Sequence, residues 1–173
     1  TFVALIPVAA AVFTSCTATE GLELRRLTLD GEERSYYLHI PGDMDPSNPA
    51  PLVIALHRFT GTGARMAKLT GFNAVADAKG FLVAYPNGKN RRFNVDTDSG
   101  PDDVAFILAV IEDIAGGRAL DRSRVCLTGA SNGGFLVYKL VCEHPETFAA
   151  AAPVMATFLD DIARACGNGV QIP

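Results

Sequence analysis

The sequence has 173 residues, of which 49% are hydrophobic and 20% are charged, so it can form one globular domain with a sizeable core. The net charge of -4 provides no basic face for nucleic acid, and a nucleic-acid-binding function is excluded. The three histidines do not have metal-ligand spacing, and we expect neither a metal nor another cofactor.

The N-terminal segment is apolar from residue 2 to residue 13 and too short to cross a bilayer, so we interpret residues 1–15 as the remnant of a secretory signal and 16–21 as a linker. A buried N-terminal strand or helix is the alternative. Small residues before Cys16 resemble the bacterial lipoprotein cleavage box, which makes Cys16 the candidate lipidation site and membrane anchor. We therefore expect a protein that is secreted or held at the outer surface of a bacterium as a lipoprotein, with simple cleavage and release as the alternative.

Short apolar runs and turn signals organise the chain after residue 21. Residues 24–29 and 35–40 are predicted as two strands that turn at Asp30-Gly31. Residues 52–56 form an unbroken apolar run, which predicts a strand covered on both faces. A helix is predicted at 72–79 and another strand at 81–85.

The clearest helical pattern begins at Ser99–Asp103 and ends at Gly116-Gly117, with apolar residues at helical spacing between them. We attribute Asp102 and Asp103 to capping and to the helix dipole. A last strand is predicted at 148–154. Because strands and helices alternate, the sheet is expected to be mostly parallel, and residues 22–173 form a single unit without an internal linker.

The most informative segment consists of an apolar strand at 124–128, a turn of small residues around Ser131, and a helix at 135–143. Gly129 and Gly133 flank the serine at the two positions where a Cβ would collide with the neighbouring backbone. This pattern is typical of a nucleophile elbow. It predicts Ser131 as a catalytic nucleophile and the backbone N–H of Asn132 as an oxyanion donor at a helix N-terminus. The alternative is a glycine-rich turn whose serine caps a helix.

Export would place the four cysteines in an oxidising compartment. Cys16 belongs to the signal region and Cys126 to the strand before the elbow, which leaves Cys142 and Cys166 as the candidate disulfide pair. No cysteine occupies an elbow, so a cysteine nucleophile is not expected.

Together these motifs resemble the α/β-hydrolase esterases of the poly(3-hydroxybutyrate) depolymerase and feruloyl esterase family, including its secreted lipoprotein members. The resemblance runs from about Gly21 to the last residue, and its carriers are Pro51–His57, Ala76–Gly88, Asp102–Phe106 and Gly129–Gly134. It implies a three-layer α/β sandwich with a mostly parallel sheet. It also implies ester hydrolysis through a serine nucleophile, an acyl-enzyme and an oxyanion hole.

The resemblance assigns roles to individual positions. Ser131 matches the nucleophile and Asn132 the first oxyanion donor, while Phe59 holds the position whose backbone N–H is the second donor. Arg58 stands where the family has glycine. If that position requires a positive φ, we expect arginine to strain the loop by about 1–3 kcal/mol.

The same family order requires an acid and then a histidine after the serine. His144 lies about 20 Å along the helix from Ser131, and Asp160 and Asp161 precede any seventh strand. His39 and His57 are assigned structural roles. We therefore expect the first six strands of a catalytic domain, with the C-terminal strands, the acid and the histidine base missing and this chain inactive alone.

Two further expectations follow. The strand at 148–154 would become an apolar sheet edge that invites association.

The leading function is an exported serine carboxylester hydrolase that acts on a plant cell-wall acyl ester, such as a feruloyl or acetyl ester, or on a polyhydroxyalkanoate. The substrate-binding residues are not assigned. The alternatives are a surface-anchored binding protein without turnover, and a serine peptidase or acyltransferase on the same fold.

Overall fold

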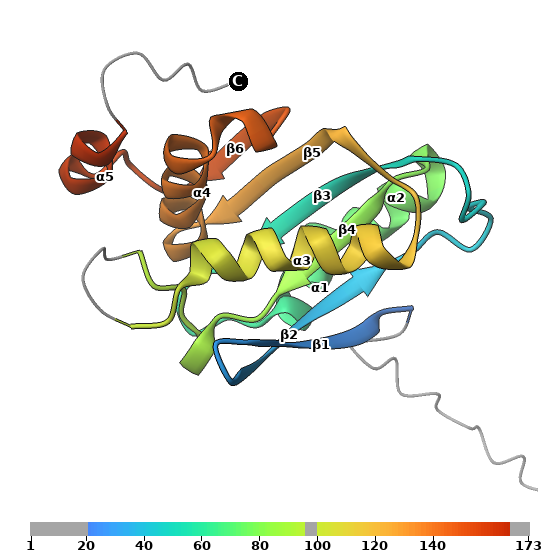
Figure 1. Cartoon of the computed structure of the whole chain (residues 1–173), viewed down its shortest axis with the longest axis horizontal. Helices are drawn as coiled ribbons and strands as arrows, with labels where there is room; N and C mark the ends of the chain where they lie inside the picture. Colours follow the sequence, from blue (N-terminus) through green and yellow to red (C-terminus); the bar gives the residue numbers. More distant parts are fainter. Residues whose placement is uncertain (1–20, 96–99, 167–173) are drawn as a thin grey trace, which may run out of the picture.

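The computed structural model describes residues 21–95 and 100–166 (Figure 1). The predicted signal remnant and Cys16 lie outside the described residues. In chain order the elements are β1 (Glu23–Leu29), β2 (Glu32–His39), β3 (Ala50–Leu56), α1 (Gly63–Thr70), α2 (Phe72–Lys79), β4 (Leu82–Pro86), the 3-10 turn η1 (Lys89–Arg91), α3 (Asp103–Gly117), β5 (Leu120–Ala130), α4 (Asn132–Glu143), the 3-10 turn η2 (Pro145–Thr147), β6 (Ala150–Val154) and α5 (Asp160–Ala165).

The strands form a six-stranded sheet in the order β1-β2-β4-β3-β5-β6. The β4-β3-β5-β6 part is parallel, whereas β1 and β2 form an antiparallel hairpin whose second strand pairs antiparallel with β4. The predicted mostly parallel α/β architecture is confirmed. Because the carboxyl ends of parallel strands meet at one edge of the sheet, the segments that follow β3 and β5 lie next to each other.

Helices cover both faces of the sheet, which gives three layers (Figure 1). Alternate residues of β3 point to opposite faces: Leu52, Ile54 and Leu56 pack in the larger core cluster with α3 and α4, whereas Ala55 packs with α1 and α2. The continuous apolar run of β3 follows from this burial on two sides. No helix within residues 21–95 and 100–166 combines the length and apolar character needed to cross a bilayer.

The two elements on either side of Ser131 begin earlier than the sequence predicts. β5 begins at Leu120 rather than at residue 124, because Leu120 pairs with Ala50 of β3 ahead of a register shift that no apolar pattern marks. α4 begins at Asn132 rather than at residue 135, since its two early glycines are selected by close packing and not by helix propensity.

α1 was not expected from the apolar pattern. Its start is capped by the side chain of Thr62, which accepts a hydrogen bond from Arg65 N, and it ends at Gly71 in the left-handed conformation. β6 forms one edge of the sheet, and its last residue, Val154, is 48% exposed. The expected apolar edge strand is therefore present.

Candidate active site

Ser131 occupies the turn between β5 and α4 with φ of 52° and ψ of -114°. Its backbone N–H donates to Val154 O at 2.8 Å, and its carbonyl accepts from Phe135 N at 2.9 Å. A positive φ in a serine costs about 1–3 kcal/mol and persists only where the surrounding structure fixes it. Here β6 and the first turn of α4 fix it from both sides.

The glycines of the elbow allow neighbouring backbone segments to lie in close contact. A Cβ on Gly129 would lie against the carbonyl of Gly133, and one on Gly133 would lie 2.5 Å from Leu56 O. The expected collision at both positions is confirmed. A Cβ on Gly134 would lie 2.7 Å from Ala156 Cβ, so a third glycine, which the sequence argument did not use, is also required.

Asn132 connects the elbow to the segment before α3. Its side-chain Oδ1 accepts from Phe93 N at 2.7 Å, and its Nδ2 donates to Phe93 O at 2.9 Å. Both polar groups of the Asn132 side chain are thus hydrogen-bonded to the backbone of one buried residue, Phe93. The backbone N–H of Asn132 begins α4, and the first N–H groups of a helix have no intrahelical partner. Its predicted use as an oxyanion donor stays a prediction.

The loop after β3, residues 57–62, lies beside the elbow. Arg58 O accepts from Gly61 N at 2.9 Å, and Thr60 N donates to Arg91 O at 2.8 Å. The Arg91 guanidinium also donates to Thr60 O, so η1 holds the loop from both directions. Phe59 is 57% exposed at its tip. The predicted role of the Phe59 backbone N–H as second oxyanion donor remains a prediction.

The expectation of backbone strain at Arg58 is wrong. Arg58 does not have a positive φ. The residue of this loop with a positive φ is Thr60, two positions later, at 62°. Arginine is therefore accommodated at this position without backbone strain, and its side chain is exposed.

His57 is a structural residue, as predicted. It is 2% exposed, its Nε2 accepts from Gly88 N at 3.0 Å, and its Nδ1 donates to Arg58 O at 2.8 Å. This bonding requires the neutral ring. Burial lowers the pKa of His57 below its usual 6.5, which keeps the ring neutral. The ring also packs against Phe93, with the ring centroids 4.4 Å apart.

None of the three histidines in the sequence is placed to serve Ser131 as a base. His39 on β2 binds Gly21 O and Asp77, three strands away from β5. His144 lies at the far end of α4 from Ser131. Both ring nitrogens of His57 are engaged by backbone.

Asp103 lies in the first turn of α3 as predicted, but it has a further role. Asp102 caps α3 as expected and accepts from Ala105 N at 2.8 Å. Asp103, in contrast, is 1% exposed and forms a buried ion pair with Arg34, whose guanidinium lies 3.9 Å from the Phe106 ring centroid. Its second oxygen accepts from Asn94 N at 2.6 Å. The pair therefore supports the chain next to Phe93, the residue that Asn132 holds.

A sequence signal for this burial exists. Asp103 stands one helical turn before Ile107, on the stripe that continues to Ile111 and Ile114. A carboxylate on a buried stripe requires a cation, but Arg34 is 69 residues away in sequence, so its identity could not be read from spacing.

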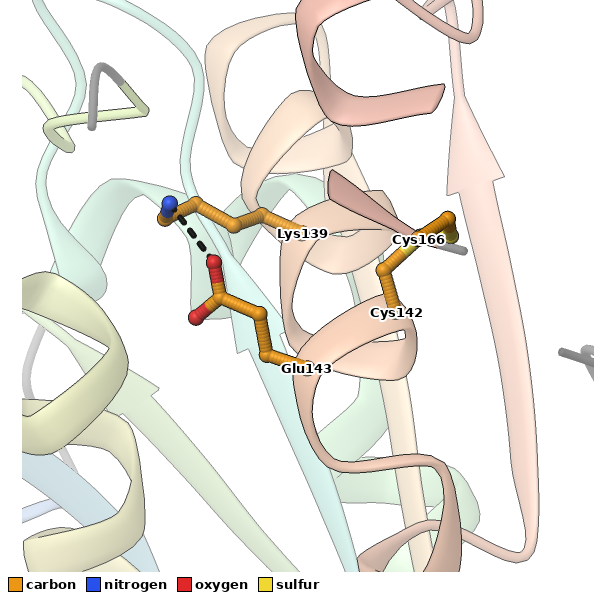
Figure 2. Close-up of a disulfide and its surroundings, with 4 residues drawn as sticks. All are labelled: Lys139, Cys142, Glu143 and Cys166. Atoms are coloured by element: carbon orange, nitrogen blue, oxygen red, sulfur yellow. Dashed lines mark ion pairs between the residues drawn. A yellow bond between two sulfur atoms is a disulfide. The ribbon is translucent and has the colours of Figure 1, made fainter. Parts of the chain in front are cut away.

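Cys142 and Cys166, the pair expected from the sequence, form a disulfide with a Cα–Cα distance of 4.6 Å. It joins the end of α4 to the residue after α5, as Figure 2 shows. The Lys139–Glu143 ion pair, at 2.7 Å, projects from another side of α4 (Figure 2). Tyr138 and Phe158 pack at 5.0 Å between ring centroids. The segment after β6 is thereby fastened to the helix that begins at the elbow.

A small pocket adjoins the elbow. It has a volume of about 150 Å³ and includes Ala130, the residue before Ser131. The other lining residues come from the loop after β3 and from α1: His57, Arg58, Gly61, Thr62, Arg65, Met66 and Leu69. Within residues 21–95 and 100–166, no three His, Cys, Asp or Glu residues are grouped as metal ligands.

A mostly parallel sheet with helices on both faces, and a strained serine between β5 and α4, define the α/β-hydrolase class. Residues 72–161 match the prolyl oligopeptidase family, and the chain belongs to this family, with relatives among the poly(3-hydroxyalkanoate) depolymerases and feruloyl esterases.

The poly(3-hydroxyalkanoate) depolymerase C of Paucimonas lemoignei is 34% identical over 68% of this chain and 30% of its own length. The feruloyl esterase C of Emericella nidulans is 33% identical over 69% of this chain and 45% of its own length. A solved thermostable esterase superposes with a TM-score of 0.69 at 22% identity, over 86% of this chain and 44% of that chain. The chain thus spans less than half the length of these proteins.

Proposed function

We propose that the protein is a serine carboxylester hydrolase in which Ser131 is the nucleophile. Ser131 Oγ adds to the ester carbonyl as a base removes its proton. The tetrahedral intermediate then collapses, the C–O bond to the alcohol breaks, and the alcohol leaves with that proton. Water hydrolyses the acyl-enzyme by the same steps and releases the carboxylic acid.

The observation that carries this proposal is the conformation of Ser131. A serine that served only as a helix cap would accept a hydrogen bond from the first turn, yet the Ser131 side chain forms no such cap bond. Its positive φ is maintained by crossings that require Gly129 and Gly133. Backbone strain of this kind clusters at active sites, and so the conformation of Ser131 supports a catalytic role.

Charge developing on the carbonyl oxygen would be stabilised from two sides. The N-terminus of α4 supplies the Asn132 N–H, and the adjacent loop supplies the Phe59 N–H. The hydrogen bonds from Asn132 to Phe93 and from Thr60 to Arg91 support this arrangement, because they hold both turns before substrate binds.

The general base and its acid are proposed to come from sequence outside these 173 residues. The three histidines present have other roles, and the relatives extend well beyond the matched region. By analogy with the named relatives, the substrate is a plant cell-wall acyl ester or a polyester. Export, with anchoring through a lipidated Cys16, belongs to the same proposal.

A binding protein that keeps the scaffold without turnover is the second candidate. It is favoured by one observation, that no histidine of the chain is placed to serve Ser131. The two candidates differ in whether the product of the full gene hydrolyses esters.

The test is hydrolysis of p-nitrophenyl acetate and methyl ferulate by the full-length gene product, by its Ser131→Ala variant and by residues 1–173 alone. Ser123→Ala, at the other end of β5, is the matched control. We expect Ser131→Ala to lower kcat by at least about 10⁴-fold and the control to retain activity. The 173-residue chain is expected to be inactive. Equal activity of Ser131→Ala and its parent would overturn the proposal, and a folded but inert full-length product would favour the binding protein.

A further inference from the structure

The pocket beside the elbow has an unusual charge distribution. Its two charged lining residues are Arg58, from the loop after β3, and Arg65, from the first turn of α1. No carboxylate from the described part of the chain lines it. Both side chains are exposed, and among the described residues neither guanidinium has a hydrogen-bond or ion-pair partner.

Most other arginines of the chain are neutralised. Arg34, Arg122 and Arg124 each pair with a carboxylate, and so do Arg25, Arg26 and Arg164. Leaving two unpaired guanidinium groups on one small pocket raises the local positive potential, and the low-dielectric pocket wall strengthens it.

The backbone beneath these two arginines is rigid. Arg58 O receives hydrogen bonds from Gly61 N and from the buried His57, and Arg65 N is bound by the Thr62 hydroxyl at 3.3 Å. Gly61 cannot carry a side chain, because a Cβ would lie 2.7 Å from Arg58 O. The guanidinium groups are therefore presented from a fixed frame with little backbone entropy to lose on binding.

Besides the two arginines and the polar His57 and Thr62, the lining includes the apolar side chains of Met66, Leu69 and Ala130. Met66 is buried, and Leu69 is 70% exposed. A cavity of about 150 Å³ accommodates a benzene-sized group. Apolar walls with two arginines suit a small hydrophobic group that ends in a carboxylate, which guanidinium binds with paired hydrogen bonds.

We propose that this pocket binds a carboxylate carried by the ester substrate, so that the enzyme prefers acidic esters to neutral ones. The proposal rests on the proposed function, and it assigns to Arg58 and Arg65 the role of substrate-specificity residues.

The experiment compares kcat/KM of the full-length gene product for p-nitrophenyl succinate, which carries a free carboxylate, with that for neutral p-nitrophenyl valerate. We expect the acidic ester to be favoured by about tenfold or more at low salt, and the ratio to fall in 0.5 M NaCl because exposed charges are screened. Arg58→Gln and Arg65→Gln should each lower the ratio severalfold, and Arg65→Glu should invert it. Arg58→Lys should retain part of it.

Arg26→Gln is the matched control, since Arg26 lies on the edge strand β1, three strands away from β3. It should leave the ratio unchanged. A ratio near one in the parent, or an equal loss for both esters in the arginine variants, would overturn the acidic-ester proposal while Ser131-dependent hydrolysis persists. Loss of the proposed function is a different result, in which neither ester is turned over by the folded parent.

Discussion

The elbow around Ser131 and the loop at residues 57–62 follow adjacent parallel strands, yet they are built differently. The elbow is fixed by backbone crossing backbone, with no room for a Cβ at Gly129, Gly133 or Gly134. The loop is fixed by hydrogen bonds to η1, and its side chains at Arg58 and Phe59 project outward. The first arrangement tolerates almost no substitution, whereas the second leaves the exposed positions free to vary.

This difference separates two tasks. A nucleophile must be held within a fraction of an ångström, and packed glycines supply that precision. A loop with a fixed backbone can carry variable side chains, and the exposed Arg58 is held there without a positive φ. Substitutions in the elbow and in the residues that support it should therefore lower the free energy of unfolding strongly. Substitutions in the loop should have smaller effects on stability.

The largest effect is expected from Asp103→Asn, which removes the charge that compensates the buried Arg34. An uncompensated buried charge costs about 3–5 kcal/mol, and urea unfolding should show this loss. The double variant Arg34→Met, Asp103→Leu should recover much of the stability, because both charges are then absent. Equal stability of Asp103→Asn and its parent would contradict the buried-pair account.

Gly133→Ala is expected to destabilise by about 3 kcal/mol, because its Cβ would lie 2.5 Å from Leu56 O. Gly116→Ala in α3 is the control, since nothing lies within 4 Å of its added Cβ. That change should stabilise by about 0.5–1 kcal/mol through lower chain entropy. Similar unfolding midpoints for the two variants would show that the elbow is not limited by packing.

Asn132→Ala should cost about 2 kcal/mol, because it leaves the buried backbone N–H and C=O of Phe93 without their partner. The kcat of the full-length gene product should fall with it, since the elbow loses its link to the α3 side. Asn48→Ala, in an exposed turn, serves as control and should change neither quantity. If Asn132→Ala lowered stability but left kcat unchanged, Asn132 would not be needed to position the elbow for catalysis.

The smallest effect concerns the loop and depends on pH. Because the folded-state pKa of His57 lies below 6.5, the unfolded chain binds more protons between those two values. Stability from the neutral ring is therefore complete above about pH 6.5 and is lost as pH falls toward the folded-state pKa. Thermal unfolding from pH 5 to 8 should show a steeper acid decline for the parent than for His57→Gln. Parallel profiles would contradict this role of burial.

Local chemistry accounts for what the sequence predicted correctly. The glycine spacing around Ser131 and the helical stripe of α3 are short-range patterns, and α3 has close to its predicted bounds. The mostly parallel sheet followed from the alternation of such elements.

What the sequence missed depends on contacts between distant residues. The Arg34–Asp103 pair joins positions 69 residues apart, and the early part of β5 is held by pairing rather than by apolar character. The left-handed step at Thr60 instead of Arg58 depends on the bonds from that loop to Arg91. None of these partners can be identified from composition or periodicity.

The central claim, that Ser131 is an activated nucleophile, is tested most directly by covalent labelling. The full-length gene product is treated with a fluorophosphonate probe, which reacts with activated serines, and the modified peptide is located by mass spectrometry. We predict one adduct per chain, on Ser131, and none in Ser131→Ala. An active protein that is labelled at a different serine, or that is not labelled at all, would contradict the claim.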